Sequence, residues 1–185
     1  MPRNNRSVDK SLKRAALLDA AEVAFVEAGF DAVSVAEVAR RCGVTATTVY
    51  WYFPSKDELL AAVVGRWLEA TLEELEPAMA GRGPAAAGAA VAAVLRQLAP
   101  LLGTLHERAG RSPAVAEVHE SAHERLAGAL AAEGVDGTAA TVFVLLIEGV
   151  LEHPWGPGLE EHLLEATVRG LAEGRLLGAT DPAVV

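Results

Sequence analysis

Two histidines lie four residues apart in a stretch that has metal-binding spacing. His119-Glu120-Ser121-Ala122-His123 matches H-E-x-x-H, which places both imidazoles on one helix face with Glu120 as a candidate base. A catalytic zinc needs a third protein ligand, and no pattern marks one among the carboxylates or His106, His153 and His162. Helices rich in Ala and Glu produce this spacing by chance. We therefore predict no metal, no cofactor and no catalytic residue, with a zinc-dependent hydrolase as the alternative.

A second stretch carries hydroxyl and aromatic groups suited to nucleic acid. Threonine methyls and aromatic rings fit against thymine methyl groups, while hydroxyls reach phosphates and base edges. Lys56, at the start of the next helix, can hold a phosphate together with free backbone N–H groups. We predict a DNA-binding surface that consists of Thr45, Ala46, Thr47, Thr48, Tyr50, Trp51, Tyr52 and Lys56.

Local signals place this surface on the second of two short helices. Ser34 and Glu37 form a capping box, in which the hydroxyl caps the first helix and the carboxylate reaches back to the cap. Gly43 ends that helix, Thr45 caps the second, and Pro54 stops it. Two short helices joined by a tight turn with glycine form the helix-turn-helix pattern.

The helical register then separates buried from exposed side chains. Val49 and Phe53 are four residues apart and should face the core, which leaves Tyr50 and Trp51 outside. The single cysteine, Cys42, excludes an internal disulfide and suits the apolar side of the first motif helix.

This part of the chain resembles the DNA-binding domain of the tetracycline-repressor (TetR/AcrR) family of one-component regulators. T-x-x-T-V-Y-W-Y-F-P-S-K-D-E-L-L, preceded by V-A-x-x-C-G-V, carries the resemblance, which covers about residues 12 to 65. Thr47 stands where many members have Gly, Ala or Pro. Val35 and Ala36 lack the hydroxyl or Arg that some members use on DNA, a difference that bears on the operator sequence.

Charge and composition fit a cytoplasmic regulator of this kind. The net charge is −9, yet residues 1–60 hold eight basic and eight acidic groups, so the excess of acid lies in residues 61–185. The first fourteen residues carry five basic groups against one acid, a local balance that suits phosphates. No uninterrupted apolar run reaches the length of ~20 residues that spans a bilayer, and we expect no membrane partner.

The helix signals predict an all-α fold of about nine helices. Outside the two motif helices, we expect helices at about 11–28, 56–76, 85–102, 104–109, 113–133, 137–152 and 159–177. The predicted domains are a flexible basic arm at 1–10, a three-helix helix-turn-helix domain at 11–60, and an effector-binding and dimerisation domain at 61–185.

The last two long helices are predicted to pair in a homodimer, as the resemblance implies. Their candidate interface residues are Val142, Leu145, Leu146, Gly149 and Val150, followed by Leu163, Ala166, Thr167, Gly170, Leu171 and Gly174. A dimer presents two reading helices about one DNA turn apart, ~34–36 Å, and so binds a near-palindromic operator.

A small-molecule pocket is expected between the helices of the second domain. Its predicted lining is Trp67, Leu68, Thr71, Leu98, Leu102, Leu105, His119, His123 and Phe143. The sequence therefore indicates a homodimeric DNA-binding transcriptional regulator, a repressor released by a small apolar effector. A helical ligand-binding module without DNA binding is a further alternative to the hydrolase.

Overall fold

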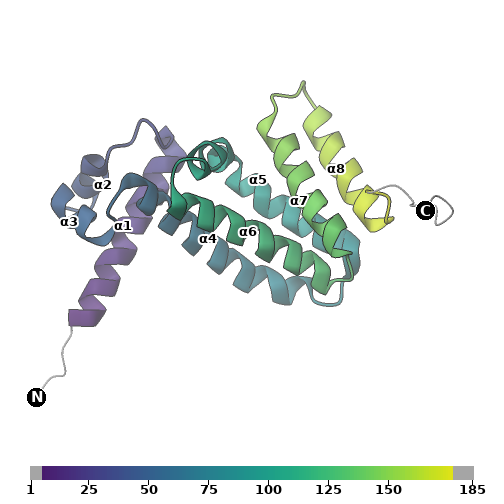
Figure 1. The fold of residues 1–185 in the computed structure, drawn as a ribbon, viewed down its shortest axis with the longest axis horizontal. Coiled ribbons are helices and arrows are strands. Elements are labelled where there is room, and N and C mark those ends of the chain that lie inside the picture. The colour runs from purple at the N-terminus through teal and green to yellow at the C-terminus, as the bar shows by residue number, and fades with distance from the viewer. Residues whose placement is uncertain (1–5, 177–185) are drawn as a thin grey trace, which may run out of the picture. The chain divides into compact units, whose positions relative to one another are not determined.

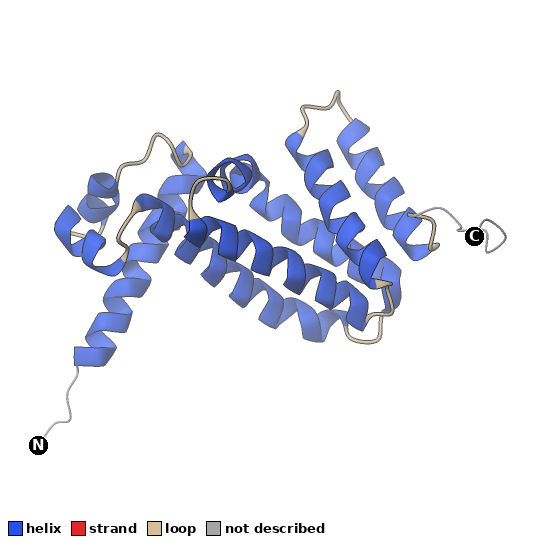
Figure 2. Cartoon of the chain, in the orientation of Figure 1, coloured by secondary structure: helices blue, strands red, loops and turns tan. Residues whose placement is uncertain are grey.

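The computed structural model describes residues 6–176, which fold into eight helices (Figure 1). Loops and turns join these helices (Figure 2), and the predicted all-α fold is confirmed. The helices are α1 (Arg6–Ala28), α2 (Val35–Arg41), α3 (Ala46–Tyr52), α4 (Lys56–Met79), α5 (Gly83–Ala109), α6 (Pro113–Ala132), α7 (Gly137–Glu152) and α8 (Leu159–Ala172).

The described chain divides into two compact units that do not follow sequence order. The first unit contains the described residues up to Trp67 together with Thr104–Val118. The second unit contains Leu68–Gly103 and the described residues from His119 onward. The predicted domains, by contrast, follow one another along the chain and meet at residue 60.

The first unit packs α1, α2, α3 and the first turns of α4 around one apolar core. Val49 and Phe53 are buried, as the register of the second motif helix predicts. They join a core that also contains Leu17, Leu18, Ala21, Phe25, Val38, Leu59, Leu60 and Val63. This burial fixes which face of α3 is directed away from the core.

Predicted caps hold the short helices in place. The Ser34 and Thr45 hydroxyls accept hydrogen bonds from the backbone N–H groups of Glu37 and Thr48, at 3.1 and 3.3 Å. Gly43 adopts a φ of 64° in the turn between α2 and α3, a conformation that glycine enters without a steric penalty.

The first and last helices each differ from the sequence prediction at one end. α1 begins at Arg6, so residues 6–10 of the predicted flexible arm are helical, while residues 1–5 lie outside the described part. Asp9 in the first turn favours this start, because its carboxylate faces the positive end of the helix dipole and pairs with Lys13. At the other end, α8 stops at Ala172 because Gly174, with a φ of 66°, turns the chain.

Prolines interrupt neither α4 nor α5. α4 continues past Pro77 to Met79, and α5 continues past Pro100, so the predicted separate helix at 104–109 is the end of α5. A proline leaves the carbonyl four residues earlier without its helical donor. Here those carbonyls belong to the exposed residues Glu73 and Arg96, where water can hydrogen-bond them.

The second unit has its own core, in which α7 packs against α8. Leu72, Leu95, Leu102, Leu130 and Phe143 are fully buried there. The Asp136 carboxylate caps α7 by accepting from two backbone N–H groups at 3.0 and 3.1 Å.

α5 combines length with apolar composition. Among the described helices it is the one long and apolar enough to cross a bilayer, judged by those two properties, and half of its apolar window is buried inside the protein. A core helix of a globular protein has the same properties, and Val91, Leu95 and Leu102 of α5 are core residues.

Candidate nucleic-acid interface

The outer face of α3 presents aromatic and hydroxyl side chains. Trp51 is 65% exposed and Tyr50 is 49% exposed, while Thr45 and Thr47 are exposed beside them. Large aromatic rings this exposed are uncommon on a small folded unit, because burying them would remove much apolar area from water. The structure thus leaves both rings accessible from outside, as the sequence predicted.

The remaining predicted contact residues of α3 are partly occupied within the protein. Tyr52 is half-buried, and its ring lies edge-on to the Trp51 ring with centroids 4.8 Å apart. The hydroxyls of Thr45 and Thr48 lie 3.0 Å apart and share a hydrogen bond. Ala46 is half-buried at the start of the helix. The contact with Tyr52 orients the Trp51 ring, and the shared hydrogen bond orients the two threonine hydroxyls. Side chains that are already ordered lose less conformational entropy when a ligand binds.

Two basic residues of α1 lie beside the reading helix. The Lys10 ammonium is 4.5 Å from the centroid of the Trp51 ring, and the Arg14 guanidinium is 5.2 Å from that of Phe53. Both stand on one face of α1, four residues apart, and both are exposed. Their positive charges therefore lie next to the side chains of α3.

The sequence prediction assigned Lys10 to a flexible arm and counted Arg14 only among the basic groups of the first fourteen residues. The helical spacing of Lys10 and Arg14 was readable from the sequence. Their position beside α3 was not, because it depends on how α1 packs in the folded unit.

Lys56 occupies a more enclosed position than predicted. Its ammonium lies 4.1 Å from the centroid of the Phe30 ring and donates to the Asp31 carbonyl at 3.5 Å. Burial lowers the pKa of Lys56, and the nearby Asp31 carboxylate partly opposes that shift. The Lys56 ammonium therefore already has two partners within the first unit.

An ion pair joins the start of α4 to the end of α5 within the first unit. Arg108 donates to both carboxylate oxygens of Asp57, at 2.9 and 2.7 Å, and its guanidinium lies over the Phe30 ring with 5.5 Å to the centroid. Two parallel bonds fix the guanidinium plane as well as the distance. Arg108 thus holds Thr104–Val118 against the helix-turn-helix elements.

Glu37 acts differently from the predicted capping box. Instead of reaching back to the cap, its carboxylate accepts from Arg40 at 2.7 and 2.9 Å and from Arg41 at 3.1 Å. Arginines three and four residues further along the helix offer opposite charge at close range, which the cap N–H does not. Hydrogen bonds from Arg40 and Arg41 lower the pKa of Glu37 to about 2.

The predicted ligand-contact residues fall into both units. Trp67 and Leu105 belong to the first unit. Within the second, Leu68, Leu98, Leu102 and Phe143 are buried core residues, and Thr71 is half-buried. His119 and His123 line a cavity of about 290 Å³ with Glu120, Glu124, Ala127, Thr141 and Val144.

A larger cavity of the second unit involves none of the predicted ligand residues. It has a volume of about 660 Å³ and lies between α5 and α8, lined by Ala85, Ala89, Ala92, Ala93, Arg96, Gln97, Glu161, Leu164, Glu165, Val168, Arg169 and Ala172. Alanines of α5 leave this space because their side chains are short. Charged side chains at its edge offer groups that can select a ligand.

The predicted dimer helices expose some of their interface residues and bury others. Leu145 is 50% exposed on α7 and Leu146 is 44% exposed, with Gly149 exposed nearby. By contrast, Leu171 of α8 is buried within the chain, and Gly174 lies beyond the end of that helix. A contact through α7 and α8 would therefore use the α7 leucines rather than the buried Leu171.

The capped α2–α3 pair, the exposed face of α3 and the basic side chains of α1 define the first unit as a helix-turn-helix of the DNA-binding kind. Comparison with known proteins agrees. Residues 17–63 match the family described as bacterial regulatory proteins, tetR family. This part of the chain is therefore similar to the DNA-binding domain of TetR-family transcriptional regulators.

The curated relatives match the chain over part of its length. RutR of Escherichia coli K12, an HTH-type transcriptional regulator, is 37% identical over 71 residues, which are 38% of this chain and 34% of RutR. The chain therefore spans about a third of the length of the curated relatives that it matches.

Solved structures match over most of the chain. A transcriptional regulator from Rhodococcus sp. Rha1 is 25% identical with a TM-score of 0.66, covering 87% of this chain and 96% of that one. A regulator-like structure from Saccharomonospora viridis, solved in complex with choline, has a TM-score of 0.67 at 17% identity, covering 86% of this chain and 95% of that one. The second likeness concerns the fold alone.

The zinc-dependent hydrolase is not supported by these findings. The family match and the structural matches described above concern transcriptional regulators. The H-E-x-x-H spacing arises on a helix of the regulator fold and does not by itself indicate catalysis.

Proposed function

We propose that the chain acts as a homodimer that binds near-palindromic duplex DNA through α3 and represses transcription until a small molecule releases it. The observation that carries the proposal is the exposed face of α3, where Tyr50 and Trp51 are accessible and the basic residues Lys10 and Arg14 lie next to Trp51 and Phe53. Aromatic and hydroxyl groups can read base edges and methyl groups, while flanking cations bind phosphates without regard to sequence.

The proposed DNA contacts divide into reading and positioning groups. Tyr50, Trp51 and Thr47 face outward and are assigned to bases and their nearest phosphates. Thr45, Ala46, Thr48, Tyr52 and Lys56 complete the predicted set, with Tyr52 and Lys56 on the DNA backbone. We add Lys10 and Arg14 to the positioning group because they lie next to α3 in the folded unit.

A dimer follows from the geometry of DNA as well as from the family. Regulators of this family act as dimers, and two copies of α3 about one turn apart, ~34–36 Å, enter successive major grooves on one side of the duplex. The exposed leucines of α7, Leu145 and Leu146, supply apolar area for such a contact. Binding of one copy places the second near its half-site, which raises the overall affinity.

The proposed effector is a small, mainly apolar molecule bound in the second unit. The cavity of about 660 Å³ between α5 and α8 has a mainly apolar lining of Ala, Leu and Val side chains with a few charged groups. The choline complex of the Saccharomonospora viridis protein supports small-molecule binding by this fold. Such a ligand releases DNA only if it binds the DNA-free conformation more tightly.

Selection of bound sequences from random duplex DNA tests the proposal. The expected product is an inverted repeat whose half-sites lie about one helical turn apart. Recovery of no enriched sequence, at a salt concentration where a positive-control regulator gives one, would contradict DNA reading and favour the helical module without DNA binding. The enriched duplex then serves to screen small molecules for release.

A further inference from the structure

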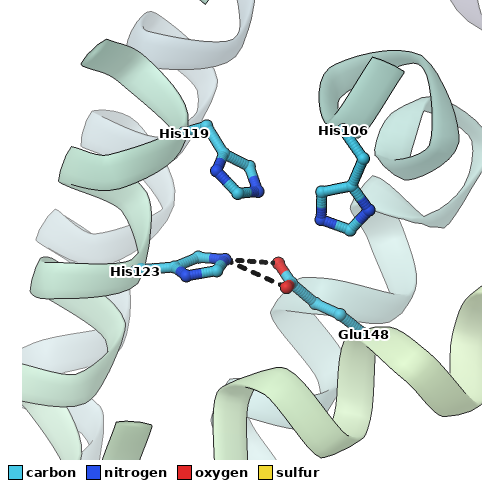
Figure 3. A group of neighbouring side chains, drawn as sticks. All are labelled: His106, His119, His123 and Glu148. Atoms are coloured by element: carbon cyan, nitrogen blue, oxygen red, sulfur yellow. Dashed lines mark hydrogen bonds and ion pairs between the residues drawn. The ribbon is translucent and has the colours of Figure 1, made fainter. Parts of the chain in front are cut away.

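Three side chains of the second unit converge from two helices. His119 and His123 lie on α6, and Glu148 lies on α7 (Figure 3). The two imidazole rings have centroids 4.4 Å apart, and His123 Nε2 lies 2.9 and 3.0 Å from the two Glu148 carboxylate oxygens. Candidate ligand atoms of the three residues all lie within 4.8 Å of one another. Figure 3 also draws His106, which belongs to the first unit and is not counted here as a ligand.

Glu148 is an unusual residue for its position. It is 4% exposed and stands on α7, the most apolar helix of the chain, directly after the buried Ile147. A carboxylate at a buried position loses its hydration and needs positive charge close by. An apolar side chain at this point of α7 would pack without that requirement, so the acid indicates a cation.

A protonated His123 could supply that charge alone, and a simple ion pair would then explain the contact. The position of His119 favours a metal site over a simple ion pair. Its ring stacks at a tilt against His123, four residues away on the same helix face, and brings a second imidazole nitrogen to the same point. Two protonated imidazoles at this separation would repel each other, whereas two neutral ones can share a metal ion.

Solvent can reach the two histidines. They line the cavity of about 290 Å³ near the middle of α6, where the exposed Glu120 and Glu124 add negative charge. This space provides an entry path for a cation and room for a water molecule that completes the coordination shell.

We propose that His119, His123 and Glu148 bind one divalent transition-metal ion, with Zn²⁺ as the probe. Two imidazoles and one carboxylate are a donor set that holds Zn²⁺ with a further position open to water. Tetrahedral ligands at about 2.1 Å from zinc lie roughly 3.4 Å apart, so candidate atoms that lie within 4.8 Å of one another need to approach by at most about 1.4 Å. Rotations about the side-chain bonds of Glu148 and His119 change these distances without a movement of either helix.

The site is structural or regulatory in kind and is distinct from the zinc-dependent hydrolase, which the comparisons do not support. Binding would join α6 to α7, the helix that carries the exposed Leu145 and Leu146. An effect of metal on DNA affinity rests on the proposed function, whereas metal binding itself does not. The test therefore measures binding in the absence of DNA.

The experiment titrates the chelator-treated full chain with Co²⁺ and then with Zn²⁺. Co²⁺ should give visible ligand-field absorption that saturates at one ion per chain, and one equivalent of Zn²⁺ should abolish it. His119→Gln and Glu148→Gln should each weaken Zn²⁺ binding by at least about 10–100-fold, because each removes a ligand. His153→Gln, at an exposed histidine outside the group, is the matched control and should bind as the wild type does.

Circular dichroism of each variant verifies folding before the titration. If Glu148→Gln does not fold, His119→Gln carries the test, since His119 makes no part of the His123–Glu148 ion pair. The proposal is overturned if the wild type binds less than one ion per chain at saturation. It is equally overturned if His119→Gln binds Zn²⁺ as tightly as His153→Gln, which is the outcome that a simple ion pair predicts.

Discussion

Removal of the Lys10 charge should change how DNA affinity depends on salt. Lys10 lies on α1 with its ammonium 4.5 Å from the centroid of the exposed Trp51 ring, where the account places a phosphate contact. Each neutralised phosphate adds about 0.9 to the slope of log affinity against log salt. A dimer contains two copies of Lys10, so Lys10→Ala should lower the magnitude of that slope by about 1.8.

This difference is large enough to measure. When the salt concentration rises from about 50 to about 200 mM, the ratio of wild-type affinity to Lys10→Ala affinity should fall about 12-fold. Fluorescence anisotropy with the selected duplex, repeated at four or five salt concentrations, gives both slopes. Arg82→Ala, at an exposed basic residue of the second unit, is the matched control and should leave the slope unchanged.

A second role for Lys10 would give a different result. Its stacking against Trp51 could orient that ring without any phosphate contact, since a cation above an indole face is attracted to it. Lys10→Ala would then weaken binding by the same factor at every salt concentration. Parallel lines for the wild type and Lys10→Ala would refute the assignment of a phosphate contact.

Three further predictions concern the elements that position and pair the reading helix. Thr45→Ala should lower the unfolding free energy by about 1 kcal/mol in urea titrations, because it removes the cap of α3, and Thr45→Ser should restore most of it. Glu37 has a folded pKa of about 2 against an ordinary value of 4.5, so its stabilising contribution is present above about pH 4.5 and is lost as the pH falls toward 2. Glu37→Gln should flatten the pH dependence of stability in that window, and an unchanged profile would show that the arginine contacts do not persist in solution. Leu145→Glu combined with Leu146→Glu should give a monomer by sedimentation, whereas a dimer of unchanged affinity would place the interface elsewhere.

The parts of the fold predicted correctly depend on contacts between residues close in sequence. The caps at Ser34 and Thr45 and the turn at Gly43 need only a few neighbouring residues, and the structure has all three. The burial of Val49 and the exposure of Trp51 follow from helical register alone. For the same reason, the outward face of α3 could be described from the sequence.

Features that depend on distant residues were not predictable in this way. Lys10 and Arg14 approach α3 only because α1 packs against the motif helices. Glu148 joins His119 and His123 from another helix, and its sequence neighbours are apolar, so no local pattern marks it as a partner. Long-range packing brings these groups together, and a single sequence does not record it.

The most direct measurement of the central claim compares specific and non-specific DNA binding of Trp51→Ala. The claim is that the exposed face of α3 reads base sequence. We expect Trp51→Ala to lose affinity for the selected duplex while its affinity for a scrambled duplex stays near that of the wild type. Val26→Ala, which alters another exposed apolar side chain of the first unit, should bind both duplexes as the wild type does. If Trp51→Ala discriminates between the two duplexes as well as the wild type, the claim is contradicted.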